Sequence, residues 1–276
     1  MRHIKLIFCF LLFNQLVVSH AWGENASNQM ESPASDTIVQ MYASESTESL
    51  LDKAASAYAA RKYDIAIDIY EYLLEKNGAS ANVYYNLGNA YFKNEKMAQA
   101  ILNYERSMKL NPGDADTKHN LELCKTKIVD QITPLGKFIF ARWYQSLYQS
   151  FSSNWWSIFG IVSAFIFSIC LACYFLGRKR WIKKTCFFVG VLAMIFAIFG
   201  IIFANKSYQK VQQSDEAILF SLSVTAKSSP DQSGNDLFVL HEGVKVVIKS
   251  QLGDWCEVEL EDGNVGWLQM KDLVII

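Results

Sequence analysis

Two long stretches without a charged residue constrain this chain more than any other feature. The first runs from Trp156 to Leu176 and the second from Thr185 to Ala204. At about 1.5 Å per residue, a helix formed by either stretch would cross a hydrocarbon core of about 30 Å. A buried helix of a soluble domain would show polar residues at helical spacing, and these stretches show almost none. They therefore predict a two-helix transmembrane hairpin within a multidomain membrane protein.

The segment between the two stretches, residues 177–184, predicts the orientation of the hairpin. Five of its eight residues are Lys or Arg, whereas the outer flanks of the hairpin are less basic. Short basic loops stay in the cytoplasm, so this loop is expected to be cytoplasmic. Both arms of the chain are then expected on the opposite side of the membrane.

The first 21 residues have the composition of a secretory signal peptide. Arg2 and Lys5 precede an apolar run that ends at Val18, and small residues follow at positions 19 and 21. The run is shorter than the roughly 20 residues that a spanning helix needs. We expect residues 1–21 to be a cleaved signal peptide, with an uncleaved anchor as the alternative. Residues 22–47, rich in Ser, Asn and Glu, are expected to form a flexible lead-in.

A 34-residue period organises the exported N-terminal arm. The clearest unit resembles the tetratricopeptide repeat (TPR), and the residues that carry the resemblance are Tyr84, Leu87, Gly88, Tyr91, Ala100, Tyr104 and Pro112. Gly88 and Ala100 are expected to be small because the two helices of a repeat cross there. A degenerate first copy has Ala54, Ala66 and Tyr70, and a closing helix follows around Leu121. We expect residues 48–130 to form an all-α TPR domain.

The TPR resemblance also implies a ligand site on the concave face, which the first helix of each repeat forms. In the clearest unit, the residues implied to line this groove are Asn82, Tyr85, Asn86, Asn89, Phe92 and Lys93. Amides and a lysine suit the backbone and carboxylates of an extended peptide. The alternative is that these residues are simply solvated. One TPR subclass clamps peptide C-termini with basic residues; Asn86 fits that clamp, but Leu51, Ala55, Asp116 and Asn120 do not.

Alternating apolar and polar residues predict short strands in the C-terminal arm, residues 215–276. Asp262-Gly263 predicts a hairpin turn, and the strand phase places Cys256 in the core. Gly253-Asp254-Trp255 and Gly266-Trp267 resemble the bacterial SH3 family, which implies a small all-β barrel. Trp255 and Trp267 are candidates to flank a ligand groove, with a purely structural role as the alternative. Eleven acidic residues against four basic ones favour neutral or basic ligands.

Small residues recur on one face of each predicted span. They are Gly160, Ala164, Ser168 and Ala172 in the first, and Gly190, Ala193, Ala197, Gly200 and Ala204 in the second. Helices in lipid approach closely only through such residues. The two stripes are expected to pack against each other, and the alternative is that one face receives a helix of a partner. Residues 135–154 are expected to be an amphipathic segment lying in the membrane interface, and residues 205–214 a linker.

Several classes of function are disfavoured. A net charge of −1 gives no reason to expect nucleic acid as a partner. Four His and six scattered Cys offer little for metal or nucleophilic chemistry. The sequence contains no phosphate-binding loop, zinc-ligand spacing or nucleophile elbow. We therefore expect no enzyme activity, no metal site and no cofactor.

The order of these modules resembles the BatE family of the Bacteroides aerotolerance (Bat) operon. That resemblance implies a bacterial inner (cytoplasmic) membrane protein with two transmembrane helices and both soluble domains in the periplasm. It also implies a complex with other Bat proteins, including von Willebrand factor A-type membrane proteins, and a role in aerotolerance or envelope stress resistance. The leading hypothesis is an interaction scaffold. The alternative is an envelope sensor that binds peptidoglycan or a periplasmic peptide through the SH3 module.

Overall fold

The computed structural model describes residues 42–133, 136, 144, 147, 150–212 and 215–276. The residues expected to form a signal peptide, nearly all of those expected to form a lead-in and most of those expected to form an interfacial segment lie outside these ranges. The described chain divides into two compact units. One unit is a pair of long helices within residues 151–209. The other combines the helical repeats with the C-terminal sheet.

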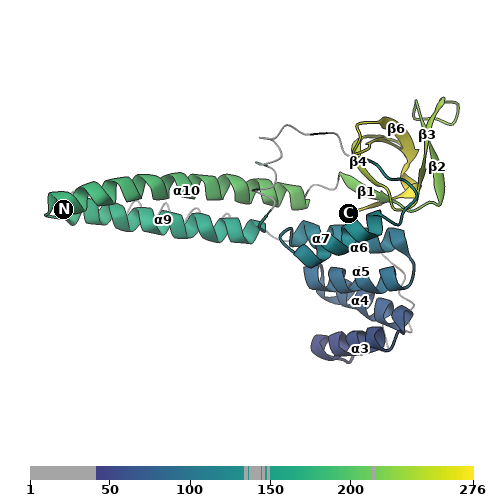
Figure 1. The fold of residues 1–276 in the computed structure, drawn as a ribbon, viewed down its shortest axis with the longest axis horizontal. Coiled ribbons are helices and arrows are strands. Elements are labelled where there is room, and N and C mark those ends of the chain that lie inside the picture. Colours follow the sequence, from purple (N-terminus) through teal and green to yellow (C-terminus); the bar gives the residue numbers. More distant parts are fainter. Residues whose placement is uncertain (1–41, 134–135, 137–143, 145–146, 148–149, 213–214) are drawn as a thin grey trace. The chain divides into compact units, whose positions relative to one another are not determined.

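Five helices in the second unit form a stack of antiparallel neighbours (Figure 1). Side-chain caps explain two of the helix starts, because Ser46 Oγ accepts from the backbone N–H of Ser49 and Asp114 Oδ2 accepts from that of Thr117. The helices are α3 (Thr47–Ala59), α4 (Tyr63–Asn77), α5 (Ala81–Lys93), α6 (Met97–Leu110) and α7 (Ala115–Lys125).

The close crossing expected at Gly88 is confirmed. A Cβ atom at Gly88 would lie 2.7 Å from Cε1 of Tyr104, so α5 and α6 can meet there only without a side chain. Ala100 is fully buried and Tyr104 is almost so. The side chains that the repeat pattern places at the helix contacts therefore form the core of the stack.

Seven strands form one antiparallel sheet in the order β3-β2-β6-β5-β4-β1-β7. Along β5, Cys256 and Val258 are buried and the residues between them face outward, which confirms the predicted phase. Gly263 has a φ of 86° in the turn after β5, a conformation that favours glycine. The strands are β1 (Glu216–Leu219), β2 (Ser223–Lys227), β3 (Asp236–His241), β4 (Lys245–Leu252), β5 (Trp255–Glu259), β6 (Val265–Gln269) and β7 (Leu273–Ile275).

The sheet packs directly against the helical stack, although the hairpin separates them in sequence. Ile218 of β1 and Ile276 after β7 are buried in the same core cluster as the repeat helices. Gly243, with a φ of 88°, approaches Ile101 and Ile128 so closely that a Cβ would lie 2.8 Å from Cγ2 of Ile128. The sequence pattern gives no sign of this contact, and the structure joins the two modules in one unit.

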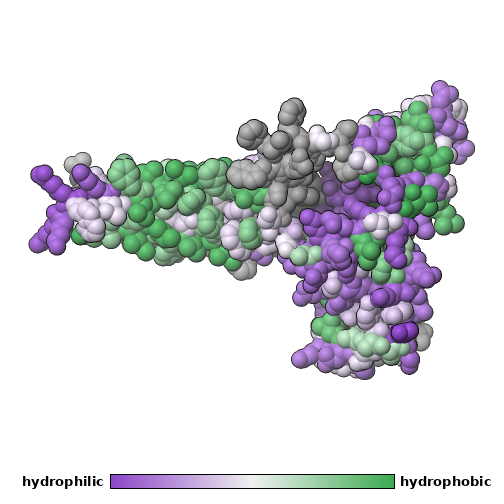
Figure 2. Space-filling model, viewed as in Figure 1, coloured by the Kyte–Doolittle hydropathy of each residue, from purple (hydrophilic) through white to green (hydrophobic). Residues whose placement is uncertain are grey.

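The other unit consists of α9 (Ser153–Leu176) and α10 (Arg180–Gln212), and both helices are long and apolar enough to cross a membrane. Apolar residues cover most of this unit, and hydrophilic residues gather at the end where the two helices join (Figure 2). The helices extend beyond the expected spans. In particular, α10 continues through residues 205–212 of the expected linker, because that segment contains no Gly or Pro to end it.

Small residues bring α9 and α10 together at two levels. A Cβ at Gly200 would lie 2.7 Å from Cα of Gly160, and a Cβ at Gly190 would lie 3.3 Å from Cβ of Cys170. On α10 the predicted stripe is the buried or half-buried face, since Gly190, Ala193 and Gly200 are buried and Ala197 and Ala204 are half-buried.

On α9 the buried face follows spacings of four and three rather than of four alone. Trp156, Gly160 and Ser163 are buried, and Phe167 is half-buried beside Gly190. Ala164, Ser168 and Ala172 of the predicted stripe are only half-buried, and Ser168 Oγ donates to the backbone O of Ala164 in its own helix. The reason is geometric: a strict spacing of four drifts around a 3.6-residue helix, whereas alternating four and three stays on one side.

Candidate functional site

The groove residues expected from the repeat pattern lie along α5. Asn82 and Lys93 are exposed at its two ends, and Tyr85, Asn86, Asn89 and Phe92 are half-buried between them. Residues three and four apart share one face of a helix, so this set forms a continuous strip about 16 Å long. An extended chain of about five residues has the same length.

A hydrogen-bonded cluster forms the floor of this strip. Asn89 Oδ1 accepts from the hydroxyl of Tyr104 (2.7 Å) and from Nδ2 of Asn120 (2.9 Å). Burial and the neighbouring Cys124, Tyr85 and Tyr58 raise the pKa of Tyr104 far above its usual range, so the hydroxyl keeps its proton and remains a donor. From the sequence, Asn120 is only a mismatch to the carboxylate clamp. The structure gives it a role in holding the amide of Asn89.

Amide donors remain available on the strip after this cluster is satisfied. Both lone pairs of Asn89 Oδ1 are used, and its Nδ2 has no partner among the described residues. The side chain of Asn86 likewise makes no hydrogen bond within the described part of the chain. The N–H groups of both side chains and the C=O group of Asn86 can therefore pair with the backbone of an extended peptide.

Lysines surround the aromatic end of the strip. Nζ of Lys127 lies 5.0 Å from the ring centroid of Phe92, and Nζ of Lys93 lies 5.9 Å from it. Lys127 follows α7 and was not singled out from the sequence. Its offset of 34 residues from Lys93 is the signal that would have found it.

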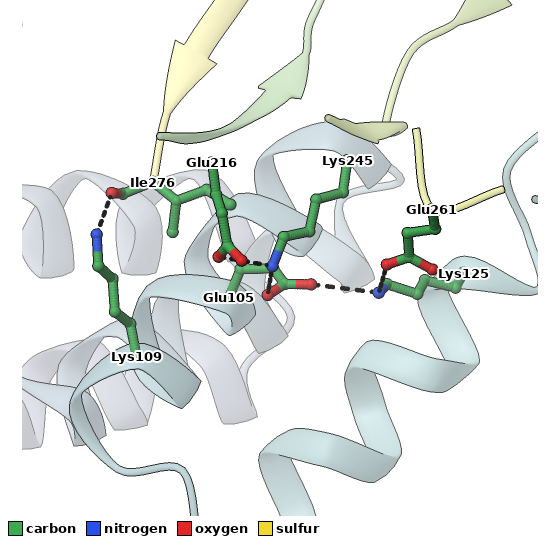
Figure 3. A network of polar contacts seen from close by, with 7 residues as sticks. All are labelled: Glu105, Lys109, Lys125, Glu216, Lys245, Glu261 and Ile276. Atoms are coloured by element: carbon green, nitrogen blue, oxygen red, sulfur yellow. Dashed lines mark hydrogen bonds and ion pairs between the residues drawn. The ribbon is translucent and has the colours of Figure 1, made fainter. Parts of the chain in front are cut away.

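The contact between the stack and the sheet contains a buried network of charges (Figure 3). Nζ of Lys245 lies 2.8 Å from Glu105 Oε2 and 2.8 Å from Glu216 Oε2. Nζ of Lys125 lies 3.2 Å from the other oxygen of Glu105 and 3.8 Å from Glu261. The side chains of Lys245 and Glu105 are only 15% and 10% exposed, so each requires the other.

The pKa values of this network follow from burial and charge together. Burial alone would raise the pKa of Glu105, but Lys245 and Lys125 outweigh it and lower that pKa. Burial would lower the pKa of Lys245, but Glu105 and Glu216 outweigh it and raise that pKa. Both groups are therefore charged at neutral pH.

Two further contacts hold the sheet to the stack. Nη2 of Arg106 donates to the backbone O of Ile275 (2.9 Å), and Nζ of Lys109 donates to that of Ile276 (3.0 Å), so α6 covers the free edge of β7. Asp130 accepts from the backbone N–H of His241 (2.6 Å) and contacts its Nδ1 (3.0 Å). None of these contacts is predicted by a local sequence pattern.

Trp255 and Trp267 project from the outer face of the sheet. Both are half-buried, and they alternate with the buried residues of β5 and β6. Glu257 lies directly opposite Trp267 across the strand pair. The two rings thus share a face with an acidic residue, and their use as a ligand groove stays a prediction.

Comparisons with known proteins bear on the helical part of the chain. A family model described as Tetratricopeptide repeat matches residues 81–114. A solved structure described as the CopN-Scc3 complex has 14% identity and a TM-score of 0.29, covering 63% of this chain and 83% of that chain. No match is found among curated proteins. Residues 81–114 are a tetratricopeptide repeat, which suggests a protein-interaction module.

Proposed function

We propose that the chain is a non-catalytic interaction scaffold anchored in the inner membrane, with its TPR and SH3-like modules in the periplasm. The proposal includes membership of the BatE type and a complex with von Willebrand factor A-type membrane proteins of the Bat system, serving aerotolerance or envelope stress resistance. The observation that carries the scaffold role is the strip on α5, where the free amide of Asn86 and the free Nδ2 of Asn89 lie beside aromatic rings in a TPR repeat.

The packing of the sheet on the stack supports a hairpin that returns to its starting side. Glu105 and Lys245 are in contact, so the segments before and after the two apolar helices must occupy the same compartment. A chain that crosses a membrane between them must then cross it an even number of times, and two helices satisfy this. The signal peptide and the basic loop favour the periplasm as that compartment.

Cysteine labelling tests this topology. We expect Lys62→Cys, in the stack, and Gln232→Cys, in the sheet domain, to react with a membrane-impermeant maleimide on spheroplasts, and Lys179→Cys to react only after permeabilisation. Lys62, Lys179 and Gln232 are exposed, and native Cys124 and Cys256 are fully buried. The chain without an added cysteine gives the background. Labelling of Lys179→Cys on intact spheroplasts would contradict the model.

The groove is tested by Asn86→Ala. A neutral hydrogen bond contributes about 0.5–1.5 kcal/mol, so recovery of a partner from solubilised membranes should weaken roughly twofold to tenfold. Asn111→Ala, at the exposed end of α6, is the matched control. Asn89→Ala is a poorer probe, because the Tyr104 hydroxyl and the Asn120 amide would lose their acceptor and the fold would lose about 1–3 kcal/mol.

The identity of the recovered material separates the scaffold from the sensor. Mass spectrometry should find a von Willebrand factor A-type membrane protein that depends on Asn86. Recovery of cell-wall fragments that requires Trp255 and is unchanged in Asn86→Ala would instead favour the sensor. The outward position of Trp255 and Trp267 is the observation that supports this alternative.

A further inference from the structure

Two lysines, one in the last turn of α5 and one just after α7, lie near one aromatic ring. Nζ of Lys93 and Nζ of Lys127 lie 5.9 Å and 5.0 Å from the centroid of Phe92. Both side chains are exposed, and neither forms an ion pair with any residue that the structure describes. The aromatic end of the strip therefore carries two positive charges that have no ion-pair partner among the described residues.

Helix capping explains this arrangement only in part. Lys93 lies in the last turn of α5, where a cation complements the helix dipole. Lys127 lies two residues beyond α7, and the basic residue in the last turn of that helix is Lys125, which pairs with Glu105. Two cations at one ring also repel each other, so a cation–π contact alone favours one lysine there, not two.

The position of the lysine pair relative to the amides points to a ligand. Asn86 and Lys93 are seven residues, or two turns, apart on one face of α5, which is about 10 Å along the helix axis. An extended chain covers that distance in about three residues. A segment whose backbone pairs with Asn86 would therefore bring a side chain to the lysine pair about three residues further along.

We propose that the groove takes an acidic extended segment of a partner protein, with an Asp or Glu side chain bound between Lys93 and Lys127 against Phe92. The charge of the pair is the reason for an acidic partner, and the proposal rests on the peptide-binding role of the groove. The site differs in position from the clamp for peptide C-termini, whose places are occupied here by Leu51, Ala55 and Asp116.

Selection from a random dodecapeptide phage library on the full chain in detergent tests the proposal. We expect enriched peptides to contain Asp or Glu, and a synthetic enriched peptide to bind about tenfold more weakly to Lys93→Gln/Lys127→Gln. Changing its acidic residue to Gln should have a similar effect, and binding should weaken as salt rises. Lys62→Gln/Lys118→Gln, which removes two other exposed lysines, is the matched control.

The possible outcomes separate this proposal from the role of the groove. Enriched peptides that depend on Asn86 but lack acidic residues, or that bind the Lys93→Gln/Lys127→Gln variant normally, would refute the acidic ligand alone. Enriched peptides that bind Asn86→Ala and the double lysine variant as well as the parent would also refute the peptide-binding role of the groove. Failure to enrich any peptide would count against both.

Discussion

Replacing Lys245 with Met should destabilise the combined stack and sheet by about 3–5 kcal/mol, the usual cost of leaving a buried charge without its partner. Lys245 is 15% exposed and contacts both Glu105 and Glu216, so the substitution leaves Glu216 without an ion-pair partner among the described residues and the buried Glu105 with Lys125 alone. Thermal unfolding of the full chain in detergent, followed by near-ultraviolet circular dichroism, would measure the loss.

Lys249→Met is the matched control, because it removes a lysine from the same strand. Lys249 pairs with Glu259 at the surface and is 48% exposed, so its loss should cost no more than about 1 kcal/mol. Adding Glu105→Leu to Lys245→Met should recover much of the stability by removing the stranded charge. A Lys245→Met variant as stable as the Lys249→Met control would show that the two modules do not depend on this network.

The pH dependence of this loss follows from the directions of the two pKa shifts. The pKa of Glu105 is lowered in the folded protein. Its contribution to folding stability is therefore complete above the ordinary pKa of 4.5 and is lost as pH falls through the pKa of the folded state. The pKa of Lys245 is raised in the folded protein. Its contribution to folding stability is therefore complete below the ordinary pKa of 10.5 and is lost as pH rises through the pKa of the folded state. The stability gap between the parent and Lys245→Met should therefore be widest between these limits and shrink in acid.

Local patterns allowed much of this structure to be predicted. The 34-residue period placed Gly88 at a close helix crossing, and strand alternation placed Cys256 inside, because both depend on neighbours within one module. The contact between the modules could not be predicted in this way. Glu105 and Lys245 are 140 residues apart, and each resembles an ordinary charged surface residue when its helix or strand is considered alone.

The candidate site was likewise predictable only in its local features. The helix period identified the face of α5. It could not show that Asn89 is hydrogen-bonded to Tyr104 and Asn120 of other helices while Asn86 is not. Lys127 was missed because it lies beyond the repeat match, at 81–114, and two residues after a closing helix whose groove positions depart from the pattern. The repeat offset gives the position of Lys127 in the sequence. Its possible role in binding is recognised only once its contact with the Phe92 ring is known.

The second large effect is expected at the crossing of the two apolar helices, where Gly200→Leu should separate α9 from α10. A Cβ at position 200 would lie 2.7 Å from Cα and 2.9 Å from N of Gly160, and 3.2 Å from the backbone O of Trp156. These are backbone atoms, so no change of rotamer relieves the clash. Overpacking costs about 1–3 kcal/mol or more, which would shift the equilibrium between packed and separated helices roughly fivefold to more than a hundredfold.

A disulfide across the hairpin would report this separation. The Cβ position of Gly190 lies 3.3 Å from Cβ of Cys170, close to the distance that a disulfide requires, so Gly190→Cys should oxidise with Cys170. With Cys173→Ser and Cys186→Ser in the background, trypsin cleavage in the basic loop leaves two fragments that only this disulfide joins. Gly200→Leu should reduce the joined product severalfold, whereas Ile198→Leu, at an exposed position of α10, should not. If Gly200→Leu preserves the joined product but abolishes recovery of a membrane partner, the stripe of small residues serves that partner's helix and not the hairpin.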